Sequence, residues 1–152
     1  MTSQYQNSGR TTPEQPSQSD PYQEPRLVKD GTPLSVLIVE DDALIAGLLT
    51  DAIEDHGGQV IGVADIPSDA FGMVVEHRPD AVIMDVRLKD GHDGLHAAEA
   101  MRLLHHTPIV FCTGYGDVKT IERIRQFGGF QCLLKPVQAD ELAHAIMRAC
   151  GL

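Results

Sequence analysis

The stretch Ala81-Val82-Ile83-Met84-Asp85 places four apolar residues directly before a single carboxylate. A short apolar run of this kind is typical of a buried parallel strand, although periodicity alone does not distinguish it from a buried piece of helix. An aspartate that ends such a strand emerges at the carboxyl edge of the sheet, where open α/β folds bind their ligands. We therefore place the centre of a candidate site at Asp85.

Three further apolar runs lead into polar side chains in the same way. They are residues 36–39 before Glu40-Asp41-Asp42, residues 109–112 before Thr113-Gly114, and residues 132–134 before Lys135-Pro136. In a parallel sheet the carboxyl ends of neighbouring strands meet at one edge. The sequence thus predicts that acids, a hydroxyl and an amine converge on Asp85.

Apolar residues at helical spacing separate these runs. We expect strands at residues 35–39, 59–63, 81–84, from 108, and 130–134, and helices at residues 42–56, from 67, 94–105, from 114, and from 140. Five strand–helix pairs in alternation indicate an α/β fold with a parallel sheet and helices on both faces. Right-handed crossovers favour the flavodoxin-like strand order 2-1-3-4-5.

Composition sets the class of protein. The 152 residues suffice for one domain, and 22 acidic against 12 basic side chains give a net charge of −10. Such acidity argues against non-specific binding to nucleic acid or anionic membranes. The three cysteines have no Cys-x-x-Cys spacing, and no apolar run reaches the roughly 18 residues of a membrane span. We expect a cytoplasmic protein, with a disordered polar tail at residues 1–33 and a domain at residues 34–152.

The predicted cluster suits phosphoryl chemistry. Three close carboxylates repel one another, and a hard divalent cation such as Mg²⁺ or Mn²⁺ relieves that repulsion. Thr113 and Lys135 are better partners for phosphoryl oxygens than for the same metal. Each element also has a simpler interpretation, because the acids can cap a helix and the other residues can serve as turn or strand-exit residues. Their shared order after apolar runs favours the common site.

From residue 34 onward the chain resembles the receiver domain of two-component response regulators. The resemblance rests on V-L-I-V-E-D-D, V-I-M-D, F-C-T-G and L-L-K-P in the family's order. It implies that Asp85 accepts a phosphoryl group from a sensor histidine kinase. It also implies that Glu40, Asp41, Asp85 and the backbone carbonyl of Arg87 hold Mg²⁺. Thr113 and Lys135 would contact the phosphoryl group, with a cis bond before Pro136.

The chain departs from the family pattern where a switch aromatic is usual, because Cys132 stands there. The run F-C-T-G-Y-G resembles the FATGUY subclass of receivers, which lacks that aromatic and pairs with kinases of the HWE and related families. The resemblance gives Tyr115 a role in place of the missing ring; a plain helix-entry residue is the alternative. The resemblance also implies that Arg87, two residues past the acceptor, tunes the lifetime of the phosphoryl group; a solvated arginine is the alternative.

The chain ends soon after the fifth expected helix, so we expect a stand-alone receiver without DNA-binding output that relays phosphoryl groups to a downstream protein. We expect contacts, including a homodimer, through the fourth helix, fifth strand and fifth helix, at Lys119, Glu122, Arg123, Gln126 and Arg148. A phosphatase of the haloacid dehalogenase type needs an acid where Arg87 stands, so we expect no separate enzyme activity. A degenerate receiver that binds partners without phosphorylation remains the alternative.

Overall fold

The computed structural model describes residues 23–114, 118–128 and 131–152. Its main sheet has five parallel strands in the order β4-β3-β5-β6-β7. In chain order these strands are β3 (Ser35–Val39), β4 (Gln59–Ala64), β5 (Ala81–Asp85), β6 (Ile109–Thr113) and β7 (Gln131–Leu134). Numbered along the chain, this is the 2-1-3-4-5 order that the sequence predicted, and the prediction is confirmed.

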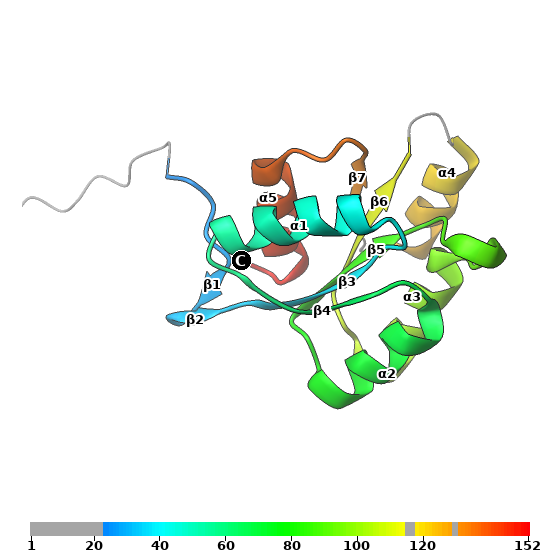
Figure 1. Cartoon of the computed structure of the whole chain (residues 1–152), viewed down its shortest axis with the longest axis horizontal. Helices are drawn as coiled ribbons and strands as arrows, with labels where there is room; N and C mark the ends of the chain where they lie inside the picture. The colour runs from blue at the N-terminus through cyan, green and yellow to red at the C-terminus, as the bar shows by residue number, and fades with distance from the viewer. Residues whose placement is uncertain (1–22, 115–117, 129–130) are drawn as a thin grey trace, which may run out of the picture.

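In the described part of the chain, five α-helices connect or follow the strands (Figure 1). They are α1 (Ala43–Asp55), α2 (Pro67–His77), α3 (Gly94–His105), α4 (Val118–Phe127) and α5 (Ala139–Ala149), with a short 3₁₀ turn η1 at Lys89–Gly91. The predicted alternation is therefore present, and several bounds differ from expectation by a residue or two. The helix expected from residue 114 is described from Val118, and residues 115–117 lie outside the described part of the chain. None of the helices in the described part of the chain combines the length and apolar character needed to cross a bilayer.

Two hydrophobic clusters form the core, one on each face of the sheet. The first packs α1 and α5 against the sheet and includes Ile53, Val110 and Ile146. The second packs α2, α3 and α4 against the opposite face and includes Val74, Phe111 and Ile124. Because both faces are covered, all five residues of β5 and of β6 are buried, as the unbroken apolar runs predicted.

Short polar residues fix where the helices begin. Asp42 caps α1, since its carboxylate accepts hydrogen bonds from the backbone N–H groups of Leu44 and Ile45 at 2.9 and 3.2 Å. Asp93 caps α3 in the same way by accepting from Leu95 N–H at 2.9 Å. These caps place the residues just before each helix at the carboxyl edge of the sheet.

The packed region begins earlier than residue 34, where the sequence placed the start of the domain. The side chain of Leu27 is fully buried in the first cluster. Strands β1 (Val28–Lys29) and β2 (Thr32–Pro33) pair as an antiparallel hairpin. Asp30 and Gly31 form its turn with φ of 51° and 78°, as the Asp-Gly pair of a two-residue hairpin requires. The prediction of a disordered tail over residues 1–22 lies outside the described residues and stays a prediction.

Candidate functional site

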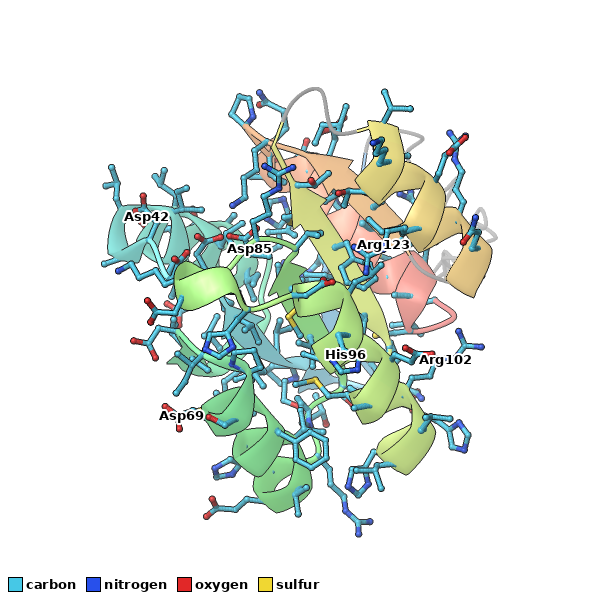
Figure 2. All side chains as sticks on the ribbon, turned by 90° about the vertical axis from the view of Figure 1, so that its right-hand side faces the viewer. Asp42, Asp69, Asp85, His96, Arg102 and Arg123 are labelled. Carbon is cyan, nitrogen blue, oxygen red and sulfur yellow. The ribbon has the colours of Figure 1, made fainter. Side chains whose placement is uncertain are left out.

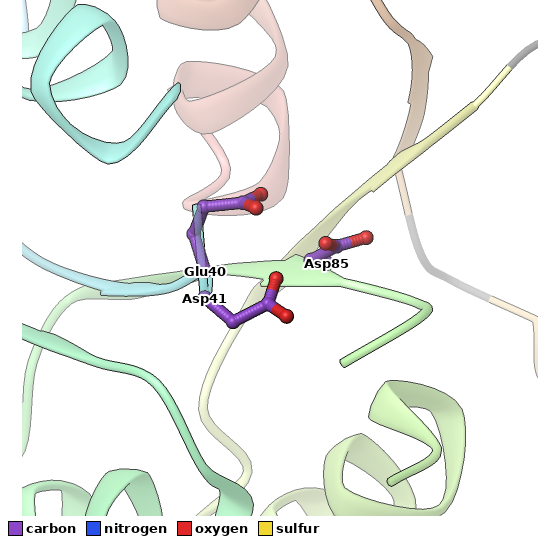
Figure 3. Close-up of side chains that lie close together, drawn as sticks. All are labelled: Glu40, Asp41 and Asp85. Atoms are coloured by element: carbon purple, nitrogen blue, oxygen red, sulfur yellow. The ribbon is translucent and has the colours of Figure 1, made fainter. Parts of the chain in front are cut away.

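Three carboxylates meet at the carboxyl edge of the sheet (Figure 3). Glu40 and Asp41 follow β3, and Asp85 ends the neighbouring β5, where Val39 pairs with Met84. One carboxylate oxygen from each residue lies within 4.8 Å of the others. Glu40 and Asp85 are only 3% and 7% exposed, so water screens this concentration of negative charge poorly.

The sequence left open whether the acids after β3 cap a helix or form a site, and the structure divides these roles. Asp42 is the cap of α1, while Glu40 and Asp41 contribute to the cluster with Asp85. The backbone N–H of Asp42 also donates to Glu40 Oε1 at 3.2 Å. The first turn of α1 therefore helps to hold Glu40 in place.

Lys135 joins the cluster from the end of β7, the edge strand two positions from β5 in the sheet. Its Nζ lies 2.9 Å from Glu40 Oε2 and 3.2 Å from Asp85 Oδ2. Burial works to lower the pKa of Lys135, but the hydrogen bond to Glu40 and the charge of Asp85 raise it above its usual value. Burial raises the pKa of Glu40, the bond to Lys135 opposes this, and the nearby Asp85 charge adds to it. Lys135 is thus held as an ammonium group.

The residues fit a hard divalent cation. One ammonium group balances only one of the three carboxylates, and the remaining negative charge favours a further cation. Carboxylate oxygens are the donors that Mg²⁺ and Mn²⁺ prefer. The backbone N–H of Arg87 donates to Asp85 Oδ1 at 3.2 Å, which orients the carboxylate. The role of the Arg87 carbonyl as a metal ligand stays a prediction.

The β6 and β7 ends complete the edge. Thr113 is buried at the end of β6, one residue beyond the Cys112 that pairs with Asp85. The backbone N–H of Lys135 donates to the carbonyl of Thr113 at 2.8 Å, and the Lys135–Pro136 peptide bond is cis. Thr113 and Lys135 therefore leave adjacent strands side by side, next to Asp85.

Gly94 is a site residue that was not predicted from the sequence. A side chain at this position would overlap the backbone carbonyl oxygen of Asp85. The backbone N–H of Gly94 donates to the carbonyl of Val86 at 2.9 Å, which closes the loop behind Asp85. Only glycine allows α3 to start this close to the end of β5. The Asp-Gly pair at a predicted helix start was the one local signal.

An ion pair between residues 30 positions apart in the chain was also not predicted from the sequence. Arg123 Nη2 of α4 lies 2.8 Å from Asp93 Oδ2, at the start of α3. Burial alone would raise the pKa of Asp93, but hydrogen bonds from Arg123 and from Leu95 N–H lower it overall. Arg123 was expected on the output surface, and the structure shows that it also contacts the loop that follows Asp85.

The three predicted switch or modulating positions differ in what the structure describes, and the tuning role of Arg87 stays a prediction. Cys132 in β7 pairs with Phe111 of β6 and is half-buried against the second cluster. Burial raises the pKa of its thiol, which therefore acts as a small apolar side chain. Tyr115 lies outside the described residues, so its predicted role stays a prediction.

This fold and this charged edge together define a receiver-type signalling domain. The family model of the response regulator receiver domain matches residues 36–147, and the chain belongs to that family. Receivers are the phosphoacceptor domains of two-component signalling, in which histidine kinases are the general partners.

Similar proteins include both longer regulators and single domains. The transcriptional regulatory protein PdtaR of Mycobacterium tuberculosis is 35% identical over 114 residues, covering 75% of this chain and 55% of PdtaR. The polar-differentiation response regulator DivK of Brucella anthropi is 32% identical, covering 78% of this chain and 98% of DivK. The solved receiver domain of a modulated diguanylate cyclase from Desulfovibrio desulfuricans has a TM-score of 0.71 at 34% identity, covering 78% of this chain and 94% of that domain.

Proposed function

We propose that this chain accepts a phosphoryl group on Asp85 from a sensor histidine kinase and passes the signal on through protein contacts. The observation that carries the proposal is the position of the Asp85 carboxylate. Its Oδ1 accepts a backbone hydrogen bond from Arg87, and its Oδ2 lies 3.2 Å from Lys135 Nζ. The side chain is therefore oriented, in contact with the ammonium group of Lys135, and placed at the edge where ligands bind in this fold.

In the proposed reaction an oxygen of Asp85 attacks the phosphorus of a phosphohistidine. The new O–P bond forms as the P–N bond breaks, and the donor imidazole takes up a proton. Lys135 shifts its hydrogen bonds from the free carboxylates to an oxygen of the transferred group, and the Thr113 hydroxyl binds another. Mg²⁺ held by Glu40, Asp41 and Asp85, with the Arg87 carbonyl, would neutralise the incoming charge.

Relatives that the match covers over nearly their whole length support a stand-alone relay. DivK is covered over 98% of its length, and the sporulation initiation phosphotransferase F of Bacillus subtilis over 90% at 27% identity. PdtaR is covered over only 55%, so the chain spans about half of that regulator. On this basis we propose a single-domain relay without DNA-binding output, with the fourth helix, fifth strand and fifth helix (α4, β7 and α5) as its contact face and homodimer face.

The FATGUY assignment is a further part of the proposal. It rests on Phe111-Cys112-Thr113-Gly114 at the end of β6 and on Cys132 at the usual aromatic position. The half-buried Cys132 beside Phe111 supports it, because β7 contains no aromatic side chain that could change position together with Thr113. We infer a kinase of the HWE type as donor, and phosphotransfer assays against kinases of that and of other families would test this.

The first test is intact mass after incubation with acetyl phosphate, with and without Mg²⁺. We expect a gain of one phosphoryl group, about 80 Da, only when Mg²⁺ is present. Asp85→Asn should show no gain. Asp42→Asn is the matched control, because asparagine still caps α1 and Asp42 lies outside the acidic cluster, so it should be phosphorylated like the wild type.

A gain that persists in Asp85→Asn would place the acceptor elsewhere and contradict the proposal. Absence of any gain, both with acetyl phosphate and with a panel of phosphorylated kinases, would favour the degenerate receiver that binds its partners unmodified. Calorimetric titration with Mg²⁺ separates these cases further, because an intact acidic cluster should bind the ion and Asp85→Asn should bind it more weakly.

A further inference from the structure

We propose that the ion pair between Arg123 and Asp93 positions α4 against the acceptor loop, residues 86–93, so that α4 follows the state of Asp85. The inference rests on the proposed function and extends it to regulation. It assigns to this pair the coupling that a threonine–aromatic pair provides in the usual family pattern, a pattern from which this chain departs at Cys132.

Few of the described side chains of α4 are buried. Among its described side chains only Thr120 and Ile124 are buried, at 7% and 3% exposure. The helix lies beside α3 at the carboxyl side of the sheet (Figures 1 and 2). Because a helix gains most of its stability in a protein from its packed apolar face, the small number of buried side chains among the described residues leaves this part of α4 responsive to single contacts.

The acceptor loop forms a compact unit that joins Asp85 to Asp93. Arg87 donates its N–H to Asp85 Oδ1 and forms an isolated antiparallel bridge with Asp93. Two backbone hydrogen bonds close the loop, from Leu88 N–H to His92 at 3.2 Å and from Gly94 N–H to Val86 at 2.9 Å. A new group on Asp85 competes for the Arg87 N–H, and the bridge carries any shift of Arg87 to Asp93.

The last link is the ion pair itself. Asp93 Oδ2 contacts Arg123 at 2.8 Å while Asp93 Oδ1 accepts from Leu95 N–H, so the two carboxylate oxygens tie α4 to the start of α3. The side chains of Arg123 and Asp93 are 50% and 37% exposed, and an ion pair that is open to water is easily broken. A contact that is present but weak can alternate between two states when the loop moves.

Hydrogen–deuterium exchange measured on peptides that cover residues 86–94 and 118–128 tests the proposal. The variants are Arg123→Gln, Asp93→Asn and the double substitution, since asparagine keeps the cap of α3 while removing the charge. Arg125→Gln is the matched control, because it makes the same charge change on the same helix but two positions along, where side chains face another direction. Each protein is measured before and after phosphorylation, with Asp85→Asn as the unphosphorylated reference.

We expect each single variant to raise the exchange rate of α4 about two- to fivefold, with the double variant equal to either single one. In the wild type, phosphorylation should change the exchange of α4, and in the three variants that change should disappear. Arg125→Gln should behave like the wild type in both respects.

Three outcomes overturn the proposal. The first is that the exchange rate of α4 in the unmodified variants equals that in the wild type. The second is that the effects of the two single variants add in the double variant. The third is a response of α4 to phosphorylation that survives in Arg123→Gln. Failure of the proposed function would be detected separately, as the absence of a mass gain with acetyl phosphate. That result would overturn the part of the proposal in which α4 responds to Asp85. Exchange in the unmodified variants would still decide whether the ion pair holds α4.

Discussion

Helices α1 and α4 each follow a strand that ends at the candidate site, yet they are attached to the molecule in different ways. Helix α1 buries Ala46, Leu49 and Ile53 in the first cluster. Its C-terminal His56 also binds Asp140 at the start of α5. In α4 the buried side chains among those described are Thr120 and Ile124, and Arg123 supplies an ion pair to the acceptor loop.

The difference separates two tasks at one edge of the sheet. In the proposed function Glu40, which the start of α1 helps to hold, and Asp41 must keep their positions for a metal ion and a phosphoryl group to bind. A helix that reports the state of Asp85 must instead have two arrangements of similar free energy, which requires weak attachment. The predictions below test this contrast, beginning with the largest expected effect.

Truncation of the buried isoleucine in each helix should give unequal losses of stability. Ile53→Ala removes a fully buried side chain from a tightly packed helix and should lower the free energy of unfolding by about 3 kcal/mol. Ile124→Ala should cost about 2 kcal/mol or less, because α4 can relax around the space. Urea denaturation measures both, and equal losses would contradict the contrast.

A methyl group at Gly94 should displace the end of β5. Its Cβ would overlap the Asp85 carbonyl oxygen, which is backbone and cannot rotate away. We expect Gly94→Ala to lower the free energy of unfolding by about 2–3 kcal/mol and to slow phosphorylation by acetyl phosphate. Thermal unfolding and intact mass over time measure the two effects, and a variant with normal stability would show that the loop adjusts at no cost.

Gly47 in α1 is the matched position where a methyl group should help. Apart from the adjacent residues and the nearby backbone of α1 itself, no described atom lies within 4 Å of the Cβ that alanine would add there. Because alanine restricts the unfolded chain and favours helix, Gly47→Ala should raise the free energy of unfolding by about 0.5–1 kcal/mol. The same denaturation experiment measures it, and a loss of stability would mean that α1 is less regular than described.

The attachment of α1 to α5 should weaken as the pH rises. His56 Nδ1 lies 2.7 Å from the carbonyl oxygen of Ala52, and Nε2 lies 3.0 Å from Asp140 Oδ1. Both partners accept, so only the protonated ring donates to both. The bond to Ala52 raises the pKa of His56, burial opposes this, and Asp140 adds to the increase.

Because the folded-state pKa is above the unfolded value, the stabilisation is complete below about pH 6 and is lost as the pH rises through the folded-state pKa. The wild type should therefore exceed His56→Gln in stability by more at about pH 5.5 than at about pH 8.5. Asp140→Asn should reduce that difference, since it removes the charged acceptor. A difference that does not depend on pH would show that the ring stays neutral.

The sequence predicted the sheet correctly because its signals are local. An unbroken apolar run such as residues 81–84 is typical of a strand that is covered on both faces, and Gly57-Gly58 marks the end of a helix without reference to any distant residue. The short hairpin before β3 was missed, although Asp30-Gly31 is a hairpin turn signal. It lies in a polar segment, and only the burial of Leu27 shows that this segment packs on the core.

The candidate site also has features that could be predicted from the sequence and features that could not. Glu40, Asp41, Asp85, Thr113 and Lys135 could be found from the sequence, because each follows an apolar run and parallel strands end together. The sequence did not show whether Asp42 caps α1 or joins the acidic cluster, because both roles suit an acid at that position. The contact of Lys135 with both Glu40 and Asp85 also depends on side-chain conformations that spacing does not set.

By itself, the sequence of this protein determined the order of its strands and the chemistry at their carboxyl ends. Apolar periodicity and turn residues act over a few positions, and parallel connections allow few topologies. Only the tertiary structure decided that Arg123 contacts Asp93 and that Gly94 lies against the Asp85 carbonyl. Those contacts join segments whose separation depends on how the helices pack, and packing is set by the whole core together.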